Sequence, residues 1–189
     1  STTDNENKYF LFGDEHILMY QVKNHCLKTL DIKLLEKFYI DIADENFDAK
    51  LDQCLMSNSL FNEKKVVFLN LSKNRLNKEL VERFKKIIAY ETDNILITEI
   101  TNLSKKVIEK DIISKLDGDG CFIDCSSPYD SEIESYLKNN LPVFLNKNEH
   151  IKVLLEMYEG NFSALLNDLE ILKILEIKEE KEAMTIFRS

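Results

Sequence analysis

The feature that most constrains the fold is an alternation of short apolar runs with helical patterns, which occupies the first two thirds of the chain. Strands separated by helices pair in parallel, because each crossover helix returns the chain to the same end of the sheet. The sequence therefore predicts an α/β domain built on a parallel sheet. The expected strands are residues 8–12, 37–42, 65–69, 94–98 and 121–125. The expected helices between them are residues 15–29, a short helix from 46 or 48, 75–89 and 104–116.

The pattern changes after Pro128, where no further convincing strand follows. Helical spacing continues over residues 129–140, 148–159 and 161–177, with Gly160 suited to end one helix and Asn161 suited to cap the next. We therefore expect two domains, an α/β domain over residues 1–128 and a small all-helical domain over residues 129–189. The charged tail from Lys178 is expected to be loosely held.

Charge excludes one class of function. The chain carries 25 Lys and Arg against 34 Asp and Glu, a net charge of −9. Neutralisation of phosphates dominates independent binding to nucleic acid, so an acidic domain is poorly suited to grip DNA by itself. The longest apolar runs fall far short of the roughly 20 residues that a membrane helix needs. The polar N-terminus has no signal-peptide core. We expect a cytoplasmic protein with no membrane contact.

Cysteine and histidine spacing gives no metal site. No cysteine pair has C-x-x-C spacing, and the histidines are scattered, so zinc is not expected. Buried, reduced thiols are the better interpretation of the cysteines. His25 beside Cys26 would need a third, orienting group to act as a nucleophile pair. The cysteines are Cys26, Cys54, Cys121 and Cys125.

An alternating α/β domain followed by helices suggests a nucleotide-hydrolysing module, but the phosphate-binding parts are missing. The turn after the first expected strand reads Gly13-Asp14-Glu15-His16, with one glycine and no Gly-Lys-Ser/Thr. Its two carboxylates would repel phosphate. The third expected strand ends in Leu69-Asn70 instead of the acidic pair that would hold magnesium. We therefore expect no ATP hydrolysis, no catalytic residues and no cofactor.

A receiver or nucleotide-binding domain of degenerate type is an alternative with the same alternation. Asp14 and Glu15 could supply the acidic pair of a receiver, and Thr98 the hydroxyl after its fourth strand. Asn70, however, stands where the phospho-accepting Asp should end the third strand. Serines stand where a Lys should follow the fifth strand.

The segment Ser57-Asn58-Ser59-Leu60-Phe61 lies between the short helix and the third expected strand. An adjacent Leu-Phe pair after polar residues can anchor in an apolar pocket on a partner, because aliphatic and aromatic anchors dominate small interfaces. The same pair could instead close the core under the sheet. Spacing alone favours the core.

Three segments of the sequence match, in order, the pattern of one family. The first is residues 8–15 (KYFLFGDE), an opening strand and turn. The second is Phe47-Asp48 followed by residues 57–67 (SNSLFNEKKVV). The third is residues 159–165 (EGNFSAL), running on to Leu169-Glu170. Together they cover most of residues 8–175, and they resemble the delta subunit family of bacterial DNA polymerase III, the opener of the sliding clamp in the clamp loader.

This resemblance implies an AAA+-like fold with a degenerate, ATP-free site and a helical lid. It also implies that Leu60 and Phe61, flanked by Ser57, Asn58 and Ser59, enter the hydrophobic peptide pocket of the sliding clamp (beta subunit) and favour an open ring. Clamp-binding peptides often have Gln at the position of Ser57 and a more apolar residue near Asn58, and both differ here.

A collar domain that joins delta to the other clamp-loader subunits should follow, and this chain ends before it. We therefore expect an N-terminal fragment, without catalytic activity, that acts on DNA only indirectly. The alternative within the same architecture is another non-catalytic AAA+-like subunit of a replication or repair assembly.

Overall fold

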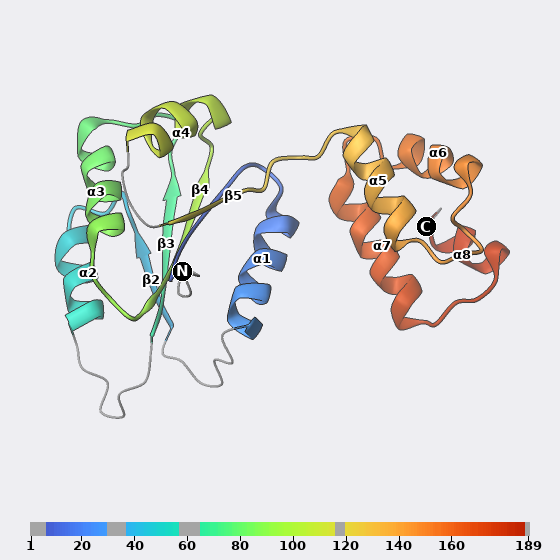
Figure 1. Ribbon diagram of the computed structural model, residues 1–189, viewed down its shortest axis with the longest axis horizontal. Coiled ribbons are helices and arrows are strands. Elements are labelled where there is room, and N and C mark those ends of the chain that lie inside the picture. Colours follow the sequence, from blue (N-terminus) through green and yellow to red (C-terminus); the bar gives the residue numbers. More distant parts are fainter. Residues whose placement is uncertain (1–6, 30–36, 57–64, 116–119, 188–189) are drawn as a thin grey trace, which may run out of the picture. The chain divides into compact units, whose positions relative to one another are not determined.

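The computed structural model describes residues 7–29, 37–56, 65–115 and 120–187 of the chain (Figure 1). The chain divides into two compact units, Ser1–Ser126 and Ser127–Ser189. The first contains the sheet, and the second contains helices and no strand among its described residues. None of the described helices is both long enough and apolar enough to cross a membrane.

The first unit is built on a parallel sheet of five strands in the order β2-β3-β4-β1-β5, which confirms the predicted α/β class. Each predicted strand is present, and β3 and β4 run further than expected. The strands are β1 (Lys8–Phe12), β2 (Lys37–Asp41), β3 (Val66–Ser72), β4 (Ile95–Thr101) and β5 (Cys121–Asp124). The helices of this unit are α1 (His16–Thr29), α2 (Phe47–Met56), α3 (Lys78–Ala89) and α4 (Lys105–Asp111), followed by the short 3-10 helix η1 (Ile113–Lys115).

The two faces of the sheet are covered unequally by the described helices. Alternate residues of a strand point to opposite faces. Leu96 of β4 packs in the larger apolar cluster, with residues of α2, α3 and α4. Ile97 packs in the smaller cluster, with residues of α1. Figure 1 shows α1 on one side of the sheet and α2 and α3 on the other. Phe68 on the α1 side is therefore only half-buried.

The strand order excludes the receiver alternative. A receiver has the order 2-1-3-4-5, in which β1 lies between β2 and β3. Here β1 pairs with β4 on one side and with β5 on the other. Because the pattern of helices and strands along the chain is the same for both orders, only the pairing distinguishes them.

Two buried lysines hold helix ends at the amino edge of the sheet. The ammonium group of Lys8, at the start of β1, donates to the carbonyl of Ile88 in the last turn of α3. The ammonium group of Lys65, just before β3, donates to the carbonyl of Cys54 in the last turn of α2 at 3.2 Å. The last carbonyls of a helix have no partner within the helix and carry partial negative charge, so a cation is stabilising there.

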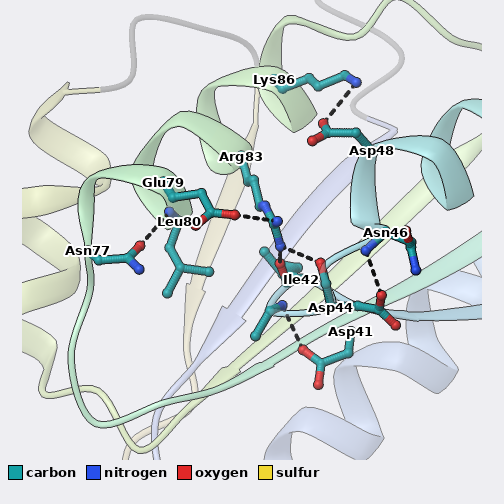
Figure 2. Close-up of polar contacts among 11 residues, drawn as sticks. Asp41, Ile42, Asp44, Asn46, Asp48, Asn77, Glu79, Leu80, Arg83 and Lys86 are labelled. Carbon is teal, nitrogen blue, oxygen red and sulfur yellow. Dashed lines mark hydrogen bonds and ion pairs between the residues drawn. The ribbon is translucent and has the colours of Figure 1, made fainter.

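A buried arginine fastens α3 to the loop between β2 and α2 (Figure 2). The Arg83 guanidinium donates to the backbone carbonyls of Ile42 and Asp44, the latter at 2.7 Å, and forms an ion pair with Glu79. It also lies 5.3 Å from the ring centre of Phe47, the first residue of α2. These contacts fix the loop because buried carbonyls need a donor.

The second unit contains α5 (Asp130–Asn140), α6 (Asn148–Met157), α7 (Phe162–Ile174) and α8 (Glu180–Ile186). Gly160 has the expected positive φ of 70°, and the Asn161 side chain caps α7 by accepting from the N–H of Ala164 at 3.2 Å. One side of α7 is buried, as its spacing predicts. Its buried residues are Phe162, Leu165, Leu166, Leu169 and Leu172.

The prediction of a loosely held tail is wrong, because the tail forms α8 and packs against the helical unit. Ala183 and Phe187 are buried, and the Phe187 ring meets the Tyr158 ring edge to face. Glu180 forms an ion pair with Lys147 at 2.8 Å, and its carboxylate lies 3.2 Å from Nε2 of His150. Few apolar residues in a charged run are enough for a helix when each of them reaches a partner.

We expect Arg83→Met to lower the free energy of unfolding by about 2–3 kcal/mol, since it leaves two carbonyls without their donor. Lys85→Met is the matched control on the same helix, because the Lys85–Glu82 pair is exposed and should contribute less than about 1 kcal/mol. Urea denaturation of the whole chain, followed by circular dichroism, measures both. Equal losses in the two variants would contradict the role of the buried guanidinium.

Candidate functional site

The turn after β1, where a nucleotide hydrolase would hold phosphate, is closed by the chain that follows β5. Gly13 has φ of 134°, a conformation that L side chains rarely adopt. A β-carbon at this position would lie 2.3 Å from the carbonyl carbon of Cys125 and 2.4 Å from the backbone nitrogen of Ser126. Glycine is needed here because a side chain would meet the backbone that follows β5.

Backbone hydrogen bonds complete this closure. The N–H of Glu15, just before α1, donates to the carbonyl of Cys125 at 3.0 Å. The N–H of Cys125 in turn donates to the carbonyl of Phe12 at the end of β1. Free N–H groups at the start of this helix are what a phosphate site requires. The N–H of Glu15 is already taken by the protein.

A groove of about 480 Å³ lies beside α1, over β2 and β3. Its floor includes the stacked rings of Tyr39 and Phe68, 5.0 Å apart, and Tyr39 is 74% exposed. The ammonium groups that line the groove are matched by the carboxylates of Asp41 and Glu99, and Lys23 forms an ion pair with Glu99. The groove has no excess of positive charge and is therefore poorly suited to phosphate.

Thr98 and Cys125, which a receiver or a thiol nucleophile would need at the surface, are both buried. Thr98 is completely buried, and its hydroxyl has no hydrogen-bond partner, so it cannot reach a phosphate. Burial, with the nearby carboxylates of Asp124 and Glu99, raises the pKa of the Cys125 thiol to about 11, which leaves it protonated and unreactive. Burial also raises the pKa of Cys26. Cys54 and Cys121 are half-buried, so the prediction of buried cysteines is confirmed only for Cys26 and Cys125.

Within the described parts of the chain, no group of three His, Cys, Asp or Glu residues is arranged to hold a metal ion.

The predicted anchor residues lie outside the described residues. They are Ser57, Asn58, Ser59, Leu60 and Phe61. The two ends of their segment are described: α2 ends at Met56, and Lys65 precedes β3. Both ends lie at the amino edge of the sheet, since β3 begins there. The segment therefore leaves and rejoins the domain at the edge opposite the closed phosphate turn.

The two buried cations that contact α2 or the loop before it were not identified from the sequence. Lys65 is buried at the start of an apolar strand, and Arg83 is buried within an amphipathic helix. A charged residue at the start of an otherwise buried strand is the signal that could have found Lys65. Arg83 has no such signal, because its neighbours Glu82 and Lys85 are charged too.

Comparison with known proteins gives one family. The family model described as DNA polymerase III, delta subunit, matches residues 9–126, more than half of the chain. The curated DNA polymerase III subunit delta of Buchnera aphidicola subsp. Schizaphis graminum is 29% identical over 170 residues. That alignment covers 88% of this chain and 50% of the relative, so the chain spans about half the length of the curated relative.

Two solved structures are similar to this chain in fold. The Bacillus subtilis DNA clamp loader delta protein matches with a TM-score of 0.58 and 13% identity, over 93% of this chain and 55% of that one. A DNA polymerase III gamma subunit-related protein from Thermotoga maritima matches with a TM-score of 0.50 and 12% identity, over 95% of this chain and 61% of that one. At these identities the matches concern the fold alone, and they confirm the predicted AAA+-like architecture.

We expect Gly13→Ala to destabilise the α/β unit by about 3 kcal/mol or more, because the new β-carbon meets rigid backbone in a strained conformation. Gly160→Ala is the matched control: its φ is also positive, but no atom lies within 4 Å of the added carbon. That control should cost about 1 kcal/mol, from backbone strain alone. Amide hydrogen exchange in urea measures the free energy of unfolding of each unit separately. Equal losses in the two variants would contradict the close packing of Cys125 on Gly13.

Proposed function

Because the chain belongs to the DNA polymerase III delta subunit family, we propose that it takes part in loading the sliding clamp for DNA replication. In this proposal Leu60 and Phe61 bind the sliding clamp (beta subunit), with Ser57, Asn58 and Ser59 flanking them, and this binding favours an open ring. The observation that carries the proposal is the family match over residues 9–126, which includes the whole anchor segment.

The physical chemistry of the segment supports an anchoring role. Full burial of a Leu or Phe side chain contributes about 1.5–3 kcal/mol. A pair therefore contributes roughly 3–6 kcal/mol to binding, or about two to four orders of magnitude in affinity. The segment starts and ends at the amino edge of the sheet, away from the closed turn at Gly13.

Ring opening requires that the protein bind the open clamp more tightly than the closed one. A ligand shifts such an equilibrium only by the difference between its two affinities. A shift from 1% to 99% open needs about 5.5 kcal/mol of preference. A rigid domain behind the anchor is suited to this, because a flexible one would adapt to both forms of the ring.

The proposed role is non-catalytic and needs no cofactor. The closed turn at Gly13 and the groove beside α1, which has no excess of positive charge, both disfavour nucleotide. The other proposed partners are clamp-loader subunits, joined through a collar domain beyond the residues of this chain. With a net charge of −9, contact with DNA is proposed to be indirect, in the cytoplasm and away from membranes.

We expect the double substitution Leu60→Ala with Phe61→Ala to weaken binding to the cognate clamp at least 100-fold, because both apolar anchors are lost. Titration calorimetry with purified clamp measures the affinity. The matched control is Ile174→Ala with Leu175→Ala, an adjacent apolar pair on the helical unit that is 75% and 60% exposed.

The control should bind as the unchanged chain does. An unchanged affinity in a folded Leu60 and Phe61 variant would contradict clamp anchoring. It would favour instead a non-catalytic AAA+-like subunit that does not bind the clamp.

We also expect the 189-residue chain to show no thermal shift with magnesium and ATP, and no ATP turnover, because the turn after β1 lacks Gly-Lys-Ser/Thr and the N–H of Glu15 already donates to the carbonyl of Cys125. Differential scanning fluorimetry measures the thermal shift, and release of inorganic phosphate measures the ATP turnover. A saturable shift, or a magnesium-dependent turnover that survives a second purification, would contradict the proposal.

A further inference from the structure

We propose that the groove beside α1 is a docking site for an amphipathic helix of a partner protein, which would lie next to α1 and over β2 and β3. The groove measures about 480 Å³, and its floor includes the stacked rings of Tyr39 and Phe68. The inference does not depend on the role proposed for Leu60 and Phe61.

The sheet face under the groove is covered on one half only. Among the described helices, α1 alone contributes to the apolar cluster on this face, whereas α2, α3 and α4 contribute to the cluster on the other (Figure 1). Ile97, Phe68 and Tyr39 are in register across β4, β3 and β2 on the α1 side. Ile97 is buried, Phe68 is half-buried and Tyr39 is exposed. The cover given by α1 therefore ends before the edge of the sheet, and aromatic surface is left open there.

The side of α1 that borders the groove has the spacing of a helix-packing surface. The residues that line the groove follow one another at i, i+3, i+4 and i+7, which places them on one side of a helix. They are Tyr20, Lys23, Asn24 and Leu27. Tyr20 is 58% exposed and Leu27 is half-buried. A helix laid beside α1 would contact both this side and the sheet face, whereas a strand added to the edge would contact β2 alone.

The two ends of the groove carry opposite charges. Lys37 and Asp41 begin and end β2, and both line the groove. Because they lie four residues apart on one strand, their side chains are on the same face. Within the described residues, neither of them has an ion-pair partner, whereas Lys23 is paired with Glu99. The groove therefore presents an ammonium group at its amino end and a carboxylate at its carboxyl end.

This pattern of charge is complementary to a helix in one direction. The N-terminus of a helix carries partial positive charge and its C-terminus partial negative charge, so the N-terminus is favoured beside Asp41 and the C-terminus beside Lys37. The four strand steps between these residues span about 13 Å, the length of about nine helical residues. α1 runs in this direction too, since it returns the chain from the carboxyl end of β1 to the amino end of β2.

The probe is a synthetic peptide of about 14 residues, stapled on its polar side because a free helix of this length is marginal in water. Leu occupies positions i, i+3, i+4 and i+7 on its apolar side, and Gln and Ala occupy the rest. A nitroxide label is attached at its N-terminus. The comparison peptide has the same apolar residues, no staple and two central prolines, so it cannot form the helix.

The peptides are titrated into the isotope-labelled 189-residue chain, and the amide resonances are followed by nuclear magnetic resonance. We expect saturable shifts in the groove, over Tyr20 to Leu27, over β2 and at Phe68. Broadening by the nitroxide should be stronger at Asp41 than at Lys37. The proline peptide should bind at least tenfold more weakly, because its apolar residues no longer lie on one side.

Two variants test the named side chains. Tyr39→Ser should raise the Kd of the stapled peptide about tenfold, since it removes an exposed ring from the floor of the groove. Tyr129→Ser is the matched control, because Tyr129 is 79% exposed on the helical unit, and it should leave the Kd unchanged. Asp41→Asn keeps a side-chain oxygen to accept from the N–H of Ala43 but removes the charge. It should raise the Kd about two- to fivefold.

An unchanged Kd in folded Tyr39→Ser would overturn the inference, and so would equal binding of the proline peptide or shifts confined to the helical unit. Groove shifts that grow with the concentration of the chain alone would also overturn it, because a second copy would then be the occupant. Broadening that is stronger at Lys37, or an unchanged Kd in Asp41→Asn, would contradict the orientation. Titration of the Leu60 and Phe61 variant with the clamp tests the proposed function separately.

Discussion

The pairing of β5 with β1 is the interaction on which most of this structure depends. It places β1 in the interior of the sheet, with Phe12 opposite Asp124. The chain leaving β5 then passes close to Gly13, and the carbonyl of Cys125 accepts from the N–H of Glu15, a donor at the start of α1 that a phosphate would need. One strand pairing thus distinguishes this fold from a receiver and disfavours phosphate at the turn after β1.

The amino edge of the sheet is where α2 ends and β3 begins, on either side of the anchor segment. There the helix ends are held by buried ammonium groups, from Lys8 on α3 and from Lys65 on α2. Buried charges are costly unless they are well paired, so they add more to geometric definition than to stability. A defined geometry is what an anchor needs when it must favour one form of a ring over another.

Much of the fold could be predicted from the sequence, because it depends on local patterns. The five strands, the parallel sheet and the helical second unit follow from hydrophobic spacing. The packing of the tail after Lys178 could not be predicted, because its charged residues favour exposure. Only the structure shows that Ala183 and Phe187 are buried in the helical unit. Nor does the apolar run of β3 show that Phe68 is only half-buried, since this depends on how much of its face of the sheet α1 covers.

The sequence by itself determined the class of fold, the absence of a Gly-Lys-Ser/Thr phosphate loop and the family resemblance, because each of these depends on residues that are close together in the chain. Tertiary structure alone decided the strand order, the contact of Cys125 with the turn after β1, and the hydrogen bonds of Lys65 and Arg83. Lys65 reaches Cys54 in another element, and Arg83 reaches the carbonyl of Ile42, which lies 41 residues away in the chain. Such contacts join elements that have no local reason to meet, so they exist only once the sheet has brought those elements together.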